Sequence, residues 1–276
     1  MLVRSSNNIY KKLKQSLGIM PDFIIIGAQK GGTSSLYAYL AKHPLIPAAS
    51  TKEIHFFDTG FSKGKSWYRK HFPSIIDKLK AKLKGKSMIT GEASPYYLFH
   101  PLAPTRIFKT LPKVKLIVIL RNPVDRAYSH YQHEVKLSFE TSETFEEAIS
   151  QEEKRLNGEV ERIINNHNYN SFNHQHYSYL SRGIYVDQLK VWFNLFGKSK
   201  VLVICSDFFY QNPSQVLKQV SDFLNLPYVE IDCYQKYNAS SYSALKPDTR
   251  QSLINFFKPH NQRLYEYLGE KFDWDK

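Results

Sequence analysis

The sequence predicts an α/β protein in which helices cover both faces of a central parallel β-sheet. Short apolar runs at residues 23–26, 87–90, 114–120 and 201–205 lack polar alternation, as expected for strands that are buried on both faces. Helical patterns separate these runs along the chain. Strands and helices that alternate in this way form βαβ units, which build a layered fold.

The helices are expected to begin and end at recognisable residues. Gly85 ends the helix that follows residue 74, while Pro123 and Pro247 suit the first turn of later helices. In chain order the helices are expected at 34–41, 75–83, from 123 onward, 184–196, from 213 onward and from 247 to about 268.

The chain of 276 residues is best explained by one core that carries an insertion. Residues 1–20 are expected to form a basic N-terminal leader, and residues 21–276 a single domain. Within that domain, residues 138–182 change from a charged helical pattern to "NNHNYNSFNHQHYSYL". We expect an inserted lid or acceptor-binding segment there.

The charge balance favours an anionic ligand. Lys and Arg total 38 against 25 acidic residues, which gives a formal net charge of +13. Four lysines lie in or just after the helix at 75–83, and we interpret them as a solvated basic face rather than a polyanion-binding patch. They are Lys78, Lys80, Lys82 and Lys84.

The cysteines and histidines give no metal site. Cys205 and Cys233 are far apart and match no zinc or disulfide pattern, so we expect a reducing compartment, the cytoplasm. His167, His174 and His176 match no structural zinc spacing, and a polar loop explains them better than a metal. No apolar run approaches the roughly 20 residues that a spanning helix needs, so membrane insertion is not expected.

The first apolar run leads into a glycine-rich turn, "GAQKGGTSS" at residues 27–35. A strand, a turn and a helix that starts at Thr33 or Ser34 present free backbone N–H groups at one point, which suits an anion. A Walker A loop has a lysine directly after its last glycine. Here Thr33 follows Gly32 and the lysine, Lys30, lies inside the loop. Taken alone, this pattern fits either a structural glycine turn or a degenerate P-loop. The position of Lys30 argues against ordinary ATP or GTP chemistry, and we expect a P-loop-like three-layer fold.

A second informative stretch is "VKLIVILRNPVDRAYSHYQHE", residues 114–134. Arg121 ends a buried strand, Asn122 can cap the next helix, and Ser129 lies on that helix. Ligands bind at the carboxyl ends of parallel strands, so Arg121 with a nearby hydroxyl could clamp a phosphate. The alternative is an Arg121–Asp125 ion pair that closes the turn.

The third stretch is "STKEIHFFD", residues 50–58. If this segment is extended, Glu53, His55 and Phe57 share one face and Lys52 points the other way. A carboxylate beside an imidazole can remove a proton from an alcohol or amine. An exposed strand of mixed charge is the alternative.

These stretches together, in this order, resemble the sulfotransferases that use 3′-phosphoadenosine-5′-phosphosulfate (PAPS), especially the heparan sulfate type and its bacterial relatives. "PDFIIIGAQKGGTSSL" is similar to the family's 5′-phosphosulfate loop, "LIVILRNPVDRAYSHYQH" to its 3′-phosphate element and "KEIHFFD" to its catalytic-base segment. "GEASPYYLFHP" resembles the strand and turn beside the acceptor, and "FFKPHNQRLYEYLGEKFDWD" the C-terminal helix.

The resemblance implies a role for each motif residue. Lys30 and the N–H groups of Gly31, Gly32, Thr33 and Ser34 are expected to hold the 5′-phosphosulfate, and Arg121 and Ser129 the 3′-phosphate. Glu53 is expected to be the catalytic base, assisted by His55. The acceptor, a polar small molecule or saccharide, is expected to contact Lys52, His55, Glu92 and Tyr96. No metal is required, and 3′-phosphoadenosine-5′-phosphate (PAP) is the product.

Two positions depart from the family pattern. The Lys-Gly-Arg loop that closes over the nucleotide is replaced by "NASSY", so hydrogen bonds from Asn238, Ser240, Ser241 and Tyr242 are expected in place of the cations. A glutamate-lysine pair of some relatives is Glu92-Ala93 here, which removes a lysine that would contact acidic glycan.

Two other classes of function remain as alternatives. A P-loop kinase or NTPase needs Mg²⁺ and a lysine after Gly32, which the sequence lacks. A nucleic-acid-binding protein would explain the charge, but the sequence shows no helix-turn-helix, zinc-finger or RNA-binding motif.

Overall fold

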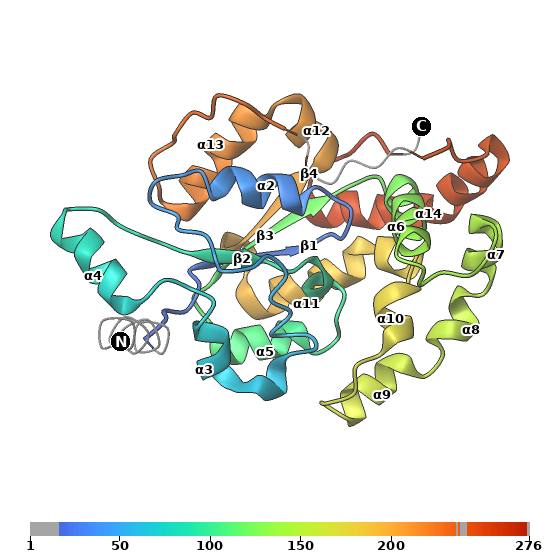
Figure 1. The fold of residues 1–276 in the computed structure, drawn as a ribbon. Helices are drawn as coiled ribbons and strands as arrows, with labels where there is room; N and C mark the ends of the chain where they lie inside the picture. Colours follow the sequence, from blue (N-terminus) through green and yellow to red (C-terminus); the bar gives the residue numbers. More distant parts are fainter. Residues whose placement is uncertain (1–16, 236, 238–241, 275–276) are drawn as a thin grey trace.

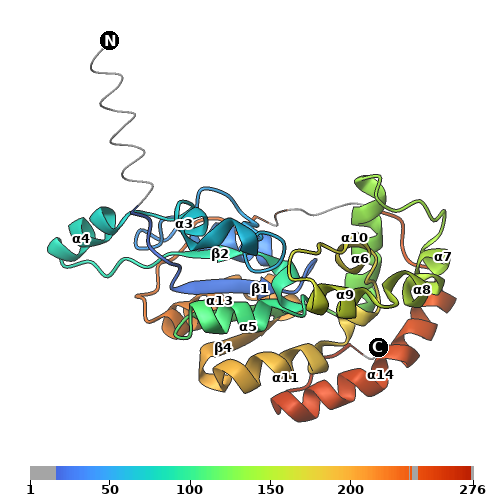
Figure 2. The ribbon, with the colours of Figure 1, turned by 90° about the horizontal axis from the view of Figure 1, so that it is seen from below.

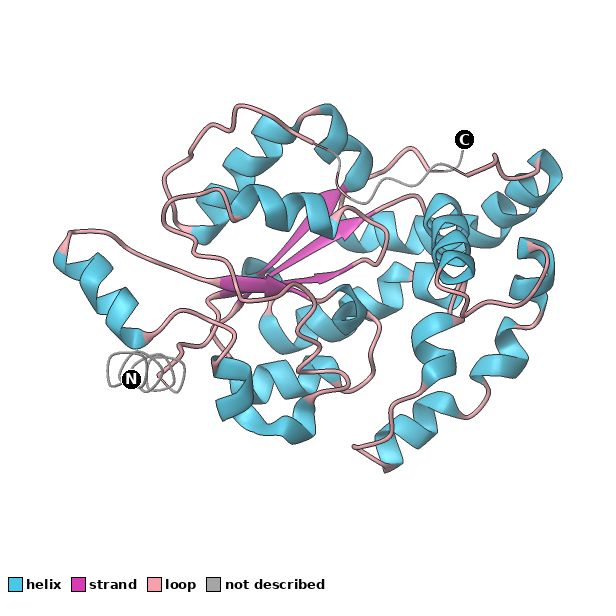
Figure 3. Cartoon of the chain, in the orientation of Figure 1, coloured by secondary structure: helices cyan, strands magenta, loops and turns pink. Residues whose placement is uncertain are grey.

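The computed structural model describes residues 17–235, 237 and 242–274. Four parallel strands form one sheet in the order β2-β1-β3-β4 (Figures 1 and 3). The strands are β1 (Phe23–Gly27), β2 (Gly91–Ala93), β3 (Lys115–Leu120) and β4 (Val201–Cys205).

Helices cover both faces of this sheet. One face is covered by α2 (Thr33–Leu40), α12 (Ser206–Gln211) and α13 (Pro213–Leu224). The other face is covered by α5 (Ala103–Thr110) and α11 (Tyr185–Phe196), and α14 (Pro247–Leu268) packs against α11 (Figure 1). The three-layer α/β fold expected from the sequence is confirmed.

The strands are apolar on both faces because each face supplies a separate core. In β1, Ile24 and Ile26 pack into the core beneath the sheet, whereas Phe23 and Ile25 pack into the core above it. Successive side chains of a strand point to opposite faces, so a strand between two helical layers has no position for a polar residue. All five residues of β1 are buried.

One strand lies later in the chain than its apolar run suggested. The pattern predicted a strand at 87–90, but β2 is Gly91–Ala93. Thr90 contacts the chain just before β1 through a hydrogen bond from the Asp22 N–H to its carbonyl (2.7 Å), and the regular ladder starts only at the Phe23–Gly91 pair. The helix predicted at 34–41 is α2, which starts and ends one residue earlier.

The remaining helices and short helical turns connect these layers. They are η1 (Phe61–Lys63), α3 (Gly64–Arg69), α4 (Ile75–Leu83), η2 (Pro95–Leu98), α6 (Pro123–Lys136), α7 (Phe145–Ser150), α8 (Glu152–Leu156), α9 (Glu159–Asn165), α10 (Phe172–His176), η3 (Ser181–Gly183) and η4 (Lys198–Lys200). Helices α7 to α10 fall within residues 138–182, the predicted insertion, and lie beside α6 at one end of the molecule (Figure 2).

The end of the predicted leader is joined to the body. Gly18 pairs with Ser74 in an isolated antiparallel bridge, and the Ile19 N–H donates to the Pro73 carbonyl at 2.9 Å. Ile19 is also part of the core beneath the sheet. Residues 1–16 lie outside the described part of the chain. Among the helices that are described, none combines the length and the apolar character needed to cross a bilayer.

Candidate functional site

The glycine turn (residues 27–34) sits at the carboxyl end of β1, and its shape depends on two glycines. A Cβ on Gly31 would lie 2.4 Å from the carbonyl oxygen of Ile119 in β3, so the turn packs against the neighbouring strand only because this residue has no side chain. Gly32 has a φ of 114° and precedes the first residue of α2. The turn therefore presents the N-terminal N–H groups of α2 at the edge of the sheet, where an anion is favoured.

Two cations meet at this edge. Arg121 follows β3 and donates from Nη1 to the backbone carbonyl of Lys30 at 3.4 Å. Burial and the charge of Arg121 lower the pKa of Lys30, while the carboxylates of Glu134 and Glu53 oppose that shift. The Arg121–Asp125 ion pair considered from the sequence is not formed, since Asp125 pairs with Arg250 at 2.6 Å. The two positive charges repel each other, and an anion bound beside them would relieve this repulsion.

Ser129 lies on α6, the helix that begins directly after Arg121. Asn122 caps this helix as expected, because its side-chain oxygen accepts from the Val124 N–H at 2.9 Å. Pro123 occupies the first helical position. Ser129 is largely buried two turns into the helix. Arg121 therefore directly precedes the capped helix that carries Ser129.

The 50–58 segment places several polar side chains in contact with one another beside the glycine turn. His55 contacts Asp58 through Nδ1 at 2.6 Å and Glu53 through Nε2 at 3.5 Å. The Lys52 ammonium donates to the other carboxylate oxygen of Glu53. Asp58 is buried and also accepts from the Thr59 N–H at 2.5 Å. An imidazole thus lies between two carboxylates.

The backbone of this segment differs from the extended strand considered from the sequence. Glu53 and His55 have φ values of 58° and 54°, in the left-handed region. The expectation that Lys52 points away from Glu53 is wrong, because its ammonium pairs with that carboxylate. Phe57 is fully buried in the core, away from the shared face that was predicted. The Glu53 N–H donates to the Ala93 carbonyl at 3.0 Å, which fixes the segment at the end of β2.

The charges of Glu53 and His55 are strongly stabilised. Burial disfavours ionisation of Glu53, but hydrogen bonds and charge from His55 and Lys52 outweigh it and lower its pKa to about 2. Burial likewise disfavours the charged His55, but hydrogen bonds to Asp58 and Glu53 raise its pKa to about 10. At neutral pH the site therefore contains an ionised Glu53 and a protonated His55.

Glu92 and Tyr96, expected to contact the acceptor, lie beneath the surface. Glu92 is 0% exposed, and its carboxylate accepts from the hydroxyls of Tyr68 (2.5 Å), Ser94 (2.7 Å) and Tyr97 (3.2 Å). Burial raises the pKa of Glu92 to about 7. A direct contact of Glu92 with an acceptor has no support in this geometry, because the core surrounds its carboxylate.

Tyr96 is also buried and shares a hydrogen bond of 2.8 Å with Nδ1 of His174 in the insertion. The hydroxyl of Ser94, one residue before η2, accepts from the His55 N–H at 3.3 Å. The motif "GEASPYY" thus contacts both the 50–58 segment and the insertion. Its residues position other groups rather than line an open surface.

Comparison with known proteins identifies the family to which this arrangement belongs. Residues 20–275 match the sulfotransferase domain family. The chain belongs to the sulfotransferase family. The family expected from the sequence is therefore confirmed, and with it the prediction of a transferase of this class.

Individual relatives agree with the family. A crystal structure of a sulfotransferase from Alicyclobacillus acidocaldarius is 31% identical, with a TM-score of 0.67 over 94% of this chain and 100% of that chain. The membrane-associated sulfotransferase kil1 of Dictyostelium discoideum is 28% identical over 92% of this chain. A heparan sulfate glucosamine 3-O-sulfotransferase 3B1 of Mus musculus is 28% identical over 93%. The chain spans 66% and 65% of the length of these two relatives.

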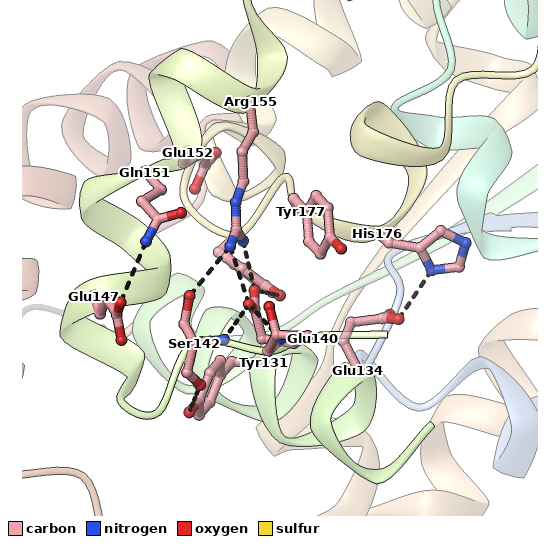
Figure 4. Close-up of polar contacts among 12 residues, drawn as sticks. Tyr131, Glu134, Glu140, Ser142, Glu147, Gln151, Glu152, Arg155, His176 and Tyr177 are labelled. Atoms are coloured by element: carbon pink, nitrogen blue, oxygen red, sulfur yellow. Dashed lines mark hydrogen bonds and ion pairs between the residues drawn. The ribbon is translucent and has the colours of Figure 1, made fainter. Parts of the chain in front are cut away.

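In this sulfotransferase-family chain one ion pair joins the insertion to α6, and a second lies within the insertion (Figure 4). Glu134 of α6 contacts His176 of α10 at 2.9 Å, and Figure 4 shows the two side chains pointing toward each other. Arg155 of α8 donates to Glu140 at 2.6 Å and lies 4.2 Å from the centre of the Tyr177 ring. Hydrogen bonds from His130 and His176 outweigh burial and lower the pKa of Glu134 to about 2. The insertion is therefore held against α6, next to Lys30.

The three histidines of the insertion have separate surroundings. His174 is buried against Tyr96, His176 pairs with Glu134, and His167 is exposed. Within residues 17–235, 237 and 242–274, no group of three metal-ligating side chains is found. A histidine that the sequence analysis did not single out, His133, lies near the site, since the charges of Lys30 and Glu53 both affect its pKa.

The closing segment is described only in part. Asn238, Ser240 and Ser241, expected to contact the nucleotide, lie outside the described residues. Tyr242 is described, and its ring lies 5.3 Å from the ring of Tyr128 on α6. Tyr242 therefore lies beside α6, the helix that carries Ser129.

Besides His133, sequence reasoning missed two other residues that the fold brings to the site. Asp58 had a detectable signal, because it follows His55 by three residues in "KEIHFFD". No pattern in the sequence indicated that Arg182 would lie at the site. It is buried at the end of the insertion and donates to the side chain of Gln29 in the glycine turn. These contacts join segments that are far apart in the sequence.

Proposed function

We propose that this chain is a PAPS-dependent sulfotransferase that transfers a sulfuryl group to a hydroxyl or an amine or amide nitrogen of a polar small molecule or saccharide. The glycine turn would bind the 5′-phosphosulfate through the N–H groups of residues 31–34 and the ammonium of Lys30. Arg121 and Ser129 would bind the 3′-phosphate. Arg121 contacts the Lys30 backbone and its charge lowers the pKa of Lys30, and two cations in one region fit a ligand that carries two anionic groups.

In the proposed reaction, Glu53 is the general base. The acceptor oxygen or nitrogen forms a bond to sulfur while the bond from sulfur to the 5′-phosphate oxygen breaks, and its electron pair leaves with PAP. Lys30 would neutralise the charge that grows on this phosphate oxygen. Glu53 would accept the proton of the attacking group, and this proton becomes acidic as the new bond forms, so a carboxylate with a pKa of about 2 is sufficient.

His55 and Lys52 would keep Glu53 ionised and aimed at the acceptor. Both side chains contact the carboxylate, and both are partly exposed, so an incoming acceptor can reach them. Asp58 would hold the His55 ring through Nδ1. The transfer needs alignment and charge stabilisation rather than a protein nucleophile.

The acceptor class is inferred from one relative and from one position of the sequence. The mouse relative is named for transfer to an oxygen of a glucosamine unit, which favours a saccharide hydroxyl here. The lysine expected beside acidic glycan is Ala93 in this chain, and that residue is buried. We therefore favour a small saccharide or polar metabolite over a sulfated polymer. A cytoplasmic location and the absence of a required metal remain parts of the proposal.

The meeting of Lys30, Arg121 and Glu53 at one edge of the sheet carries this proposal. Calorimetric titration with PAP, compared with AMP and with ATP plus Mg²⁺, tests it. Metal-independent binding of PAP that falls about 100-fold in Arg121→Ala, while AMP binding is unchanged, is the expected result. Preference for ATP with Mg²⁺ would favour a kinase or NTPase instead, and salt-dependent binding of DNA or RNA would favour a nucleic-acid-binding protein.

A further inference from the structure

Helix α4 stands away from the body of the molecule and exposes apolar side chains. Figures 1 and 2 both show it projecting at the end opposite to α7–α10. Ile75, Leu79 and Leu83 follow one another at intervals of four residues, so they form one stripe along the helix. Their exposed fractions are 44%, 53% and 88%. No residue of α4 is buried.

Basic residues flank this stripe. Residues 75–86 contain five lysines and one acid, Asp77. Asp77 is occupied by the capping box with Ser74, where its carboxylate accepts from the Ser74 N–H at 3.1 Å. Lys78 contacts Asp22 at 3.4 Å, and the other four lysines, at positions 80, 82, 84 and 86, are exposed. The surface around the stripe is therefore strongly positive.

We propose that α4 docks this chain on the surface of an anionic lipid bilayer. The helix would lie in the plane of the interface, with Leu79 and Leu83 among the upper acyl chains and the lysines extended to the lipid phosphates. An exposed apolar stripe between basic edges matches this surface, in which negative headgroups cover an apolar interior.

The charges and apolar side chains of α4 also argue against two other binding partners for this surface. A nucleic acid would satisfy the lysines but would leave Leu79 and Leu83 in water. The first 16 residues of the chain contain four basic residues and no acid, so packing them on α4 would bring like charges together. The same residues would instead be attracted to an anionic bilayer.

The position of α4 leaves the candidate site open. Residues 84–90 connect α4 to the amino end of β2, whereas the glycine turn and Arg121 lie at the carboxyl ends of β1 and β3. A bilayer on α4 would therefore contact the molecule away from Glu53. Docking is expected to locate the protein without a change in its basal activity.

Flotation of the full chain with phosphatidylcholine vesicles, with or without about one third phosphatidylglycerol, tests this inference. We expect binding to the anionic vesicles only, weaker in high salt. Leu79→Ser with Leu83→Ser, and separately Lys80→Glu with Lys82→Glu, should each lower the binding by about tenfold or more. Lys218→Glu with Lys258→Glu is the matched control, since these lysines are exposed on α13 and α14 and the change in net charge is the same.

A fluorescent probe distinguishes a bilayer from a segment of the chain itself. In Leu83→Trp, the emission of the added tryptophan should shift to the blue only when anionic vesicles are present. A blue-shifted emission without vesicles would show that the protein already covers α4 and would overturn the proposal. Absence of binding to anionic vesicles, or binding that the leucine substitutions leave unchanged, would overturn it as well.

Discussion

Arg182 and Gln29 connect two parts of the site that are 153 residues apart in the sequence. Arg182 is 2% exposed and donates from Nη1 to the side-chain oxygen of Gln29 in the glycine turn. Its Nη2 donates to the carbonyls of His174 (3.1 Å) and Gln175 (2.8 Å) in the insertion. One guanidinium thus links the proposed phosphosulfate loop to the insertion.

This link predicts that Gln29 is a positioning residue. In Gln29→Ala the buried guanidinium loses an acceptor, and the turn loses its support from the insertion. A hydrogen bond to a charged group contributes about 1.5–3 kcal/mol, so the affinity for PAP should fall by about tenfold or more. Calorimetry measures the affinity, and the pH profile of turnover should keep its shape. Gln175→Ala is the control, because Arg182 contacts only the backbone of that residue. Equal affinities in both variants would contradict the assignment.

Glu53 is expected to act on the acceptor and not on the nucleotide. Glu53→Gln retains the shape of the side chain but accepts a proton poorly, so turnover should fall by about 10² to 10⁴-fold. PAP binding should stay within about twofold, since Lys30 and Arg121 are unchanged. Turnover is followed with labelled PAPS and affinity by calorimetry. Glu161→Gln, an exposed position in the insertion, controls for the lost charge. Undiminished turnover would remove Glu53 from the mechanism.

Asp58 is expected to control the pKa of His55. The pKa of His55 is raised to about 10 by hydrogen bonds to Asp58 and Glu53, against the effect of burial. In Asp58→Asn the pKa of His55 should move down by about one unit or more, because a neutral amide replaces a carboxylate. The charged imidazole should then be lost at lower pH, and the alkaline decline of kcat/KM should move toward neutrality. Rate profiles of both proteins, with NMR titration of His55, measure this shift. Coincident profiles would show that Asp58 does not control His55.

Glu92 is expected to make the stability depend on pH. Burial raises its pKa from 4.5 to about 7. A folded-state pKa above the unfolded value means that the stabilisation is complete below the unfolded pKa and is lost as the pH rises through about 7. The difference is about 3 kcal/mol in the free energy of unfolding. Glu92→Gln lacks this titration, so the wild type should lose about that much relative to the variant between about pH 4 and pH 8. Urea unfolding across the range tests this, and parallel curves would refute it.

Local sequence patterns predicted the limits of an element correctly where its surroundings are the same along its length. The strand at 201–205 and the helix from Pro247 to Leu268 were predicted at their observed limits, because a run buried on both faces and a helix begun by proline have clear signals. The short helix α5 was missed. Its apolar side chains do fall on one face, but the helix is short, and α11 and the core supply the contacts that stabilise it.

The sequence by itself determined the layered fold, the glycine turn at Lys30 and the helix that carries Ser129, because these depend on residues close together in the chain. The tertiary structure alone decided the left-handed backbone at Glu53 and His55, the burial of Glu92 and the contact from Arg182 to Gln29. The conformational preferences of single residues disfavour these features or do not bear on them. Only packing against distant segments provides the free energy that stabilises them.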